Sequence, residues 1–152
     1  MAAFNFRLAA VLRWRDHLKK EKRWELRALN ETRRRMEAEI HALEQELHEA
    51  GEMLAGQEGE VFSPIDFRLL GEYAQFLAGR ISEHRAALAK FEAQLLAKRI
   101  ELVEAMRAVK SLEQLRKRRE EKFQREQATG EQKFADEVAQ RKFVTAASRK
   151  KH

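Results

Sequence analysis

The chain has 152 residues, of which 37% are charged and 8% aromatic, with six glycines, one proline and no cysteine. The lack of cysteine excludes a disulfide framework, thiolate catalysis and a zinc ribbon, and so few glycines and prolines exclude collagen and turn-rich β-sandwiches. No run approaches the roughly 20 apolar residues of a membrane span. The first residues lack the basic and apolar regions of a signal peptide, so we expect a chain in the reducing cytoplasm.

The first third of the chain carries apolar residues at the spacing of a coiled coil. Of the fourteen a and d positions from residue 8 to 54, ten are apolar, which is the 3.5-residue repeat of packed helices. The repeat fails between residues 15 and 22. In this part of the chain Val11, Trp14 and Leu18 could form a shifted apolar stripe instead. We predict a helix over about residues 5–56 that is loosely packed in this stretch.

The single proline marks the start of a second helix. Ser63 can cap the free amides of a helix start, Pro64 suits the first helical position, and Asp66 follows three residues after the cap. Glycines weaken the helix just before this point. The sequence therefore predicts a turn at about 57–63 and a helix over about 64–145.

The second helix repeats the heptad pattern and then loses it. Ten of the twelve a and d positions from residue 74 to 112 are apolar, and the apolar seam ends near 112–115 while helix-forming residues continue. If the chain folds back near residue 60, residue i faces residue 120 − i, and the seam ends where the first helix has no more residues to cover it. A parallel dimer of single helices would not explain that match.

We therefore predict an all-α fold, a long antiparallel two-helix coiled-coil hairpin. Residues 1–152 form one coiled-coil domain in this prediction, with 116–152 extending beyond the paired region. The expected core is Leu29, Met36, Ile40, Leu43, Leu47, Leu54, Leu77, Ile81, Leu88, Phe91, Leu95, Leu102, Val109 and Leu112.

Charge is distributed unevenly along the chain. Residues 1–35 carry +7, residues 36–115 carry −7 and residues 116–152 carry +6, which together give the net charge of +6. The hairpin would bring both basic segments to its open end, which favours an oriented encounter with a partner. The arginine runs at 33–35 and 116–119 could contact nucleic acid or stay as solvated helix faces, and both are followed by glutamates that pair with them locally. A membrane-surface role has weaker support because the C-terminal apolar residues are scattered.

Catalytic and metal chemistry find little support. Glu37, His41, Glu44 and His48 share one helix face, but a single face seldom supplies a closed set of metal ligands. His84 at a core position is either a tolerated polar residue, a register device or a pH switch. The tryptophans at 14 and 24 either cover the first helix or anchor a partner. We predict no catalytic residue, no metal site and no cofactor.

Several motifs occur in an order that resembles the flagellar export protein family FliJ. Residues 4–13, FNFRLAAVLR, resemble the family's start, and residues 72–77, EYAQFL, resemble its second-helix motif. Residues 112–119, LEQLRKRR, followed by 131–141, EQKFADEVAQR, resemble its C-terminal motif. Arg80 departs from the family pattern at a position where leucine is expected.

The resemblance implies a soluble, non-enzymatic component of the flagellar type III export apparatus, similar to the central stalk of rotary ATPases. The implied partners are the hexameric export ATPase (FliI), the export-gate membrane protein (FlhA) and possible export chaperones, with membrane association only through that apparatus at the cytoplasmic side of the basal body. ATPase contacts are implied for Phe6, Arg7, Leu12, Arg13, Arg116, Arg119, Phe123, Gln132, Lys133, Asp136, Glu137 and Arg141. Gate contacts are implied for Tyr73, Phe76 and Leu77.

Two other functions stay open on the sequence. One is the equivalent stalk of a virulence type III secretion system, and the other is a basic coiled-coil protein that binds nucleic acid. Steep salt dependence of duplex binding would favour the second.

Overall fold

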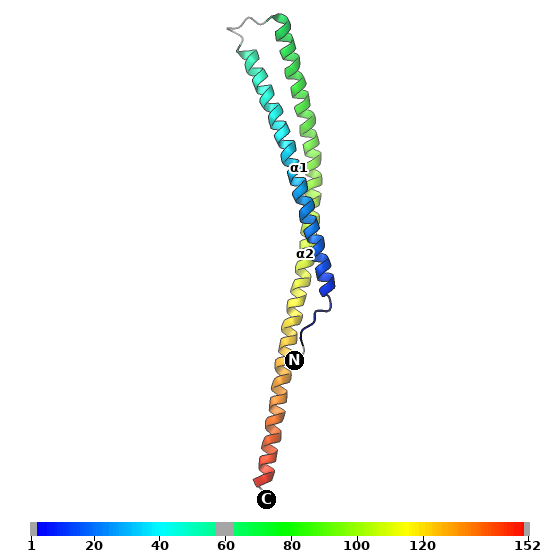
Figure 1. Ribbon diagram of the computed structural model, residues 1–152, viewed down its shortest axis with the longest axis vertical. Helices are drawn as coiled ribbons and strands as arrows, with labels where there is room; N and C mark the ends of the chain where they lie inside the picture. The colour runs from blue at the N-terminus through cyan, green and yellow to red at the C-terminus, as the bar shows by residue number, and fades with distance from the viewer. Residues whose placement is uncertain (1–2, 57–62, 151–152) are drawn as a thin grey trace. The chain divides into compact units, whose positions relative to one another are not determined.

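The computed structural model describes residues 3–56 and 63–150 of the chain. These residues form two long helices, α1 over Ala9–Ala55 and α2 over Pro64–Lys150, and no strand. The two helices lie side by side and run in opposite directions (Figure 1). The predicted all-α antiparallel hairpin is confirmed.

The start of α2 has the cap that the sequence predicted. The Ser63 hydroxyl accepts a hydrogen bond from the backbone N–H of Asp66 at 3.1 Å, and the Ser63 carbonyl accepts one from Phe67 at 3.1 Å. Pro64 takes the first helical position, where a backbone N–H is not needed. Residues 57–62, which make up most of the predicted turn, lie outside the described residues.

The observed helix bounds differ from the predicted ones at both outer ends. The first helix begins at Ala9 rather than near residue 5, because the residues before it form a non-helical segment in which Phe6 is buried. The second helix continues to Lys150 rather than ending near 145. No glycine or proline follows Gly130, and the positive charges of Arg149 and Lys150 stabilise a helix C-terminus.

The chain divides into two compact units, which are described separately. The hairpin unit consists of residues 18–105, and the terminal unit combines residues 1–17 with 106–152. In the hairpin unit, the buried side chains are Ile40, Ala50, Leu77, Ile81 and Leu95. In the terminal unit, they are Phe6 and Val109.

None of the fourteen expected core residues is exposed. Five are buried, namely Ile40, Leu77, Ile81, Leu95 and Val109. The other nine, including Leu43, Leu47 and Leu88, are half-buried. A two-helix pair has no third layer to cover the edges of the seam, so most a and d side chains keep some contact with solvent.

The register of the hairpin unit is close to the predicted one. The ion pairs Lys22–Glu101, His84–Glu39 and Arg85–Glu44 and the hydrogen bond Tyr73–Glu46 join residues whose numbers add to between 119 and 129, against the predicted 120. Of the shifted stripe at the start of α1, Val11 and Trp14 are exposed and only Leu18 is half-buried. The Arg15 guanidinium instead lies 5.1 Å from the centroid of the Trp14 ring.

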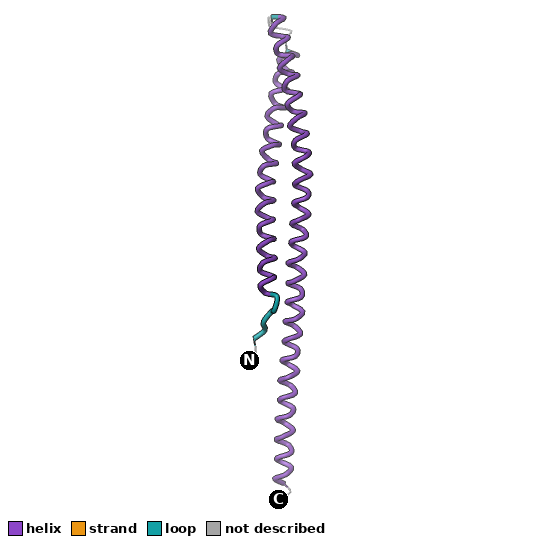
Figure 2. The backbone as a smooth tube through the Cα atoms, turned by 90° about the vertical axis from the view of Figure 1, so that its right-hand side faces the viewer, coloured by secondary structure: helices purple, strands orange, loops and turns teal. Residues whose placement is uncertain are grey.

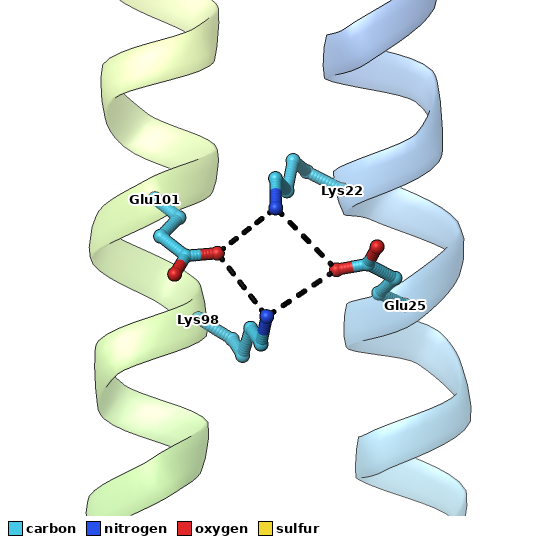
Figure 3. A network of polar contacts seen from close by, with 4 residues as sticks. All are labelled: Lys22, Glu25, Lys98 and Glu101. Atoms are coloured by element: carbon cyan, nitrogen blue, oxygen red, sulfur yellow. Dashed lines mark hydrogen bonds and ion pairs between the residues drawn. The ribbon is translucent and has the colours of Figure 1, made fainter.

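Two lysines on the seam are neutralised by two glutamates. Lys22 donates a hydrogen bond to Glu101 at 3.0 Å and lies 3.7 Å from Glu25, while Lys98 lies 3.3 Å from Glu101 and 3.6 Å from Glu25 (Figure 3). Positive and negative groups alternate around this four-membered ring. The hydrogen bond raises the pKa of Lys22 above its ordinary value and, together with the one from Lys98, lowers the pKa of Glu101. The seam therefore tolerates lysine at two core positions.

Candidate partner-binding sites

In the terminal unit, the extended segment before α1 lies alongside α2 (Figure 2). The Phe4 ring packs on Phe123 with ring centroids 5.6 Å apart, and the Arg119 guanidinium lies 5.9 Å from the centroid of the Phe6 ring. A hydrogen bond of 3.1 Å from the Ala9 amide to the Phe6 carbonyl joins this segment to the helix. The resulting aromatic and cation–π contacts fix the N-terminal residues against α2.

This arrangement changes the interpretation of several residues expected to contact the ATPase. Phe6 is buried and Leu12 and Phe123 are half-buried, so these apolar side chains are largely engaged inside the terminal unit. Arg7, Arg13, Arg116 and Arg119 are exposed. The expectation that all residues from 116 onward extend past the paired region is wrong for 116–123, because the N-terminal segment covers part of that stretch.

Beyond Gln127 the helix is exposed along its whole described length, with Val138 alone half-buried. This stretch includes the expected contact residues Gln132, Lys133, Asp136, Glu137 and Arg141, which are all exposed. The Gln132 amide donates a hydrogen bond to Asp136 at 3.3 Å, one turn further on. Three large apolar side chains in the same stretch are also exposed: Phe134, Phe143 and Val144.

The three residues expected to contact the export gate lie in different environments. Tyr73 and Phe76 are exposed, whereas Leu77 is only 2% exposed and belongs to the hairpin core. Direct partner contact by Leu77 is therefore incompatible with the closed hairpin. The Arg80 guanidinium lies 5.9 Å from the Phe76 ring centroid, which is within the range of a cation–π contact.

The Tyr73 hydroxyl donates a hydrogen bond to Glu46 of α1 at 3.0 Å. This bond to a carboxylate raises the pKa of Tyr73 above its ordinary value. It holds the exposed ring in one place on the surface, although both partners remain exposed to solvent.

Sequence reasoning missed two neighbours of Tyr73 and Phe76. Ile65 and Leu69 are exposed and lie eleven and seven residues before Phe76, which places all three on one face of α2. The sequence signal that could have identified them is their spacing of four, four and three residues from Ile65 to Phe76, at positions outside the predicted heptad seam. We call Ile65, Leu69, Tyr73 and Phe76 the α2 apolar face.

Among residues 3–56 and 63–150, no group of three or more His, Cys, Asp or Glu side chains is placed to hold a metal ion. Two members of the helical row considered for metal binding have other partners: Glu44 pairs with Arg85, and His48 lies 3.0 Å from Glu52. His84 lies 3.7 Å from Glu39 across the hairpin. No described helix has the length and apolar character needed to cross a membrane.

Comparison with known proteins gives one family match. Residues 4–148 match the family described as flagellar FliJ protein. No curated protein and no solved structure matches the chain. The match covers both helices almost completely, including the N-terminal segment and most of the exposed part of α2.

Proposed function

Because the chain belongs to the FliJ family and is thus a component of the flagellar export system, we propose that it is a non-enzymatic stalk and adaptor. It binds the hexameric export ATPase through the terminal unit and the export gate through the α2 apolar face. By binding both partners it links the state of the ATPase to that of the gate, and it hydrolyses nothing itself. These partners hold it at the cytoplasmic side of the flagellar base, where export chaperones are further candidate ligands.

The exposed helix after Gln127 is the observation that carries the ATPase assignment. Phe134, Phe143 and Val144 face solvent there although α2 continues as a helix. Exposed aromatic side chains are typical anchors at protein interfaces, and the neighbouring Lys133 and Arg141 add positive charge for steering. The segment makes few contacts within the chain, so its side chains are free to serve a partner.

A deletion of residues 128–152 tests the ATPase assignment. The deletion keeps Phe4, Phe6, Arg119 and Phe123, so we expect an almost unchanged thermal midpoint. Binding to the purified ATPase hexamer should fall by more than about tenfold, which corresponds to the loss of one or two interface anchors. Motility should be lost with it. Full ATPase binding by the shortened chain would remove the basis for this part of the proposal.

A pair of substitutions separates the two partners. Phe134→Ser with Phe143→Ser should weaken ATPase binding and leave gate binding intact, while Ile65→Ser with Phe76→Ser should do the opposite. All four side chains are exposed, so neither pair disturbs the core. If both pairs weaken both partners equally, the two-site arrangement is wrong.

A further inference from the structure

The hairpin unit carries a row of exposed apolar side chains on α2 that its own core does not use. Leu96, Ile100 and Val103 are 57%, 53% and 44% exposed. Three exposed alanines precede them at the same spacing, namely Ala86, Ala89 and Ala93. The six residues advance by alternating steps of three and four, which is the heptad spacing that one helix presents to another. We call these six residues the outer row.

The outer row faces away from α1. Leu88, Leu95 and Leu102 mark the side of α2 that packs in the hairpin core, since Leu95 is buried and the other two are half-buried. Ala93 and Ile100 each lie two residues before one of these leucines, which turns them by about 200° around the helix. The whole row therefore belongs to one face of one helix, and α1 takes no part in it.

The order of small and large residues makes the outer row complementary to itself. Its first half is made only of alanine, and its second half only of large apolar side chains. Suppose that two copies of α2 pair in opposite directions about a two-fold axis between residues 94 and 95, so that residue i faces residue 189 − i. Leu96 then faces Ala93, Ile100 faces Ala89 and Val103 faces Ala86. Large residues opposite small ones are what allows two helices to interdigitate closely.

The charges that flank the outer row fit the same register. Arg99 and Glu92 lie along one edge of the row, and Lys90 and Glu104 lie along the other. Across the two-fold axis, Arg99 meets Glu92 and Lys90 meets Glu104, with residue numbers that add to 191 and 194. These sums lie within five of 189, and the polar pairs that cross the hairpin, from Tyr73–Glu46 to Arg85–Glu44, show the same spread about their midpoint. Each dimer would thus hold every one of these pairs twice.

These four charged side chains have no competing partners. All four are exposed, and none has an ion pair with another residue in the part of the chain that the structure describes. They are therefore free to pair with a second copy without breaking a contact within the hairpin unit.

We propose that the outer row binds the outer row of a second copy of this chain, in an antiparallel α2–α2 dimer. The apolar side chains of the row supply most of the affinity, because exposed ion pairs contribute little each. The flanking charges set the direction and the register. The row is short, so the dimer belongs to the class of small, transient interfaces and dissociates at the low concentrations used in unfolding experiments.

A helix of another protein fits this surface less well. The four flanking charges cancel, so the surface selects neither an acidic nor a basic partner. A foreign helix would have to supply large residues opposite the alanines, small residues opposite Leu96 and Ile100, and the reversed order of charges. The chain already carries all three features on the same face.

Sedimentation equilibrium of the full chain tests the dimer. Between about 5 and about 500 µM at physiological salt, the mass should rise reversibly from monomer toward dimer. Leu96→Ser with Ile100→Ser should weaken dimerisation by more than about tenfold, the size expected for losing interface anchors. The matched control, Leu69→Ser with Phe76→Ser, removes two exposed apolar side chains from the α2 apolar face and should change it by less than about twofold. A chain that stays monomeric over this range, or equal weakening by both variants, overturns the proposal.

Cysteine pairs test the direction of the two helices, because the chain has no cysteine of its own. Ala89→Cys with Ile100→Cys should give a disulfide-linked dimer on mild oxidation, since these positions face each other across the axis. Within one chain they lie about 16 Å apart along the helix, too far for a disulfide. Ile100→Cys with Val103→Cys should stay monomeric on reducing-agent-free gels. Crosslinking of this second pair instead of the first would mean parallel helices and would contradict the proposed register.

A charge swap gives a test that keeps the composition of the chain. Lys90→Glu sets two glutamates against each other and should weaken dimerisation by about threefold or more. Lys90→Glu with Glu104→Lys restores opposite charges and should return the affinity to within about twofold of the parent. If the double variant is as weak as the single one, Lys90 and Glu104 do not meet. These assays contain neither ATPase nor gate, so their results are independent of the stalk assignment.

Discussion

The ring centroid of Phe4 lies 5.6 Å from that of Phe123, with the ring planes tilted by 48°. This contact joins an extended N-terminal segment to the middle of α2, beside the Arg119 guanidinium over Phe6. It extends the packed part of the terminal unit past the last apolar heptad position. The exposed, partner-accessible part of α2 therefore begins after Gln127 rather than at residue 116.

Replacing Phe6 should loosen the terminal unit. Phe→Ala in a closed core costs about 3–5 kcal/mol, and we expect a value at or below the lower end because this core is one layer thick. Hydrogen exchange of the amides in residues 9–17 should accelerate in Phe6→Ala. Phe143→Ala is the control, because Phe143 is exposed and its loss should leave those amides protected. Unchanged exchange in Phe6→Ala would mean that the N-terminal segment does not stabilise the start of α1.

The heptad pattern predicted the helical hairpin because it records which side chains can be buried together. Leu77, Ile81, Leu95 and Val109 are apolar at a or d positions and are buried. The pattern could not predict the extended segment, since helix propensity takes no account of the burial of Phe6 against another helix. The lysines at 22 and 98 looked like interruptions of the seam, and only the three-dimensional arrangement shows the glutamates that neutralise them.

The motif around Tyr73 was a less reliable predictor of which side chains are available to a partner. It grouped Phe76 and Leu77, yet consecutive helical residues point about 100° apart, and here one is exposed while the other is buried. A short motif records residues that recur together in sequence. It does not separate those that face a partner from those that hold the helix in place.

The ring of charges at Lys22 and Glu101 should make stability depend on pH at both extremes. The pKa of Glu101 is lowered on folding, so its contribution is present above about pH 4.5 and is lost as pH falls through the lower folded value. The pKa of Lys22 is raised above 10.5, so its contribution is present below that pH and is lost as pH rises further. Glu101→Gln should lower the thermal midpoint at neutral pH, with the difference from the parent shrinking toward pH 3. A constant difference across that range would show that the ring is not the cause.

The single tyrosine of the chain allows a direct test of the Tyr73–Glu46 hydrogen bond. Absorbance of tyrosinate should report a titration above the ordinary value of 10.0, because the Glu46 carboxylate accepts a hydrogen bond from the neutral hydroxyl and repels the phenolate. Glu46→Gln should move that titration back toward 10.0. Since the folded pKa is raised, this bond contributes stability at neutral pH and loses it as pH rises through the folded value. Identical titrations of the parent and Glu46→Gln would show that the bond is not populated in solution.

Two adjacent leucines test the register of the whole hairpin unit. Leu95 is 1% exposed, whereas Leu96, the next residue along α2, is 57% exposed. Leu95→Ala should cost about 2–5 kcal/mol, the range for removing a leucine from a closed core, measured by denaturant unfolding. Leu96→Ala makes the same chemical change without leaving a cavity and should cost less than about 0.5 kcal/mol, as surface substitutions do. A register shifted by one residue would rotate α2 by 100° and bring Leu96 toward α1, so similar costs at the two positions would contradict the arrangement of the helices. The comparison is sharp because the two variants share composition, charge and helix propensity, and differ only in which face of α2 they alter.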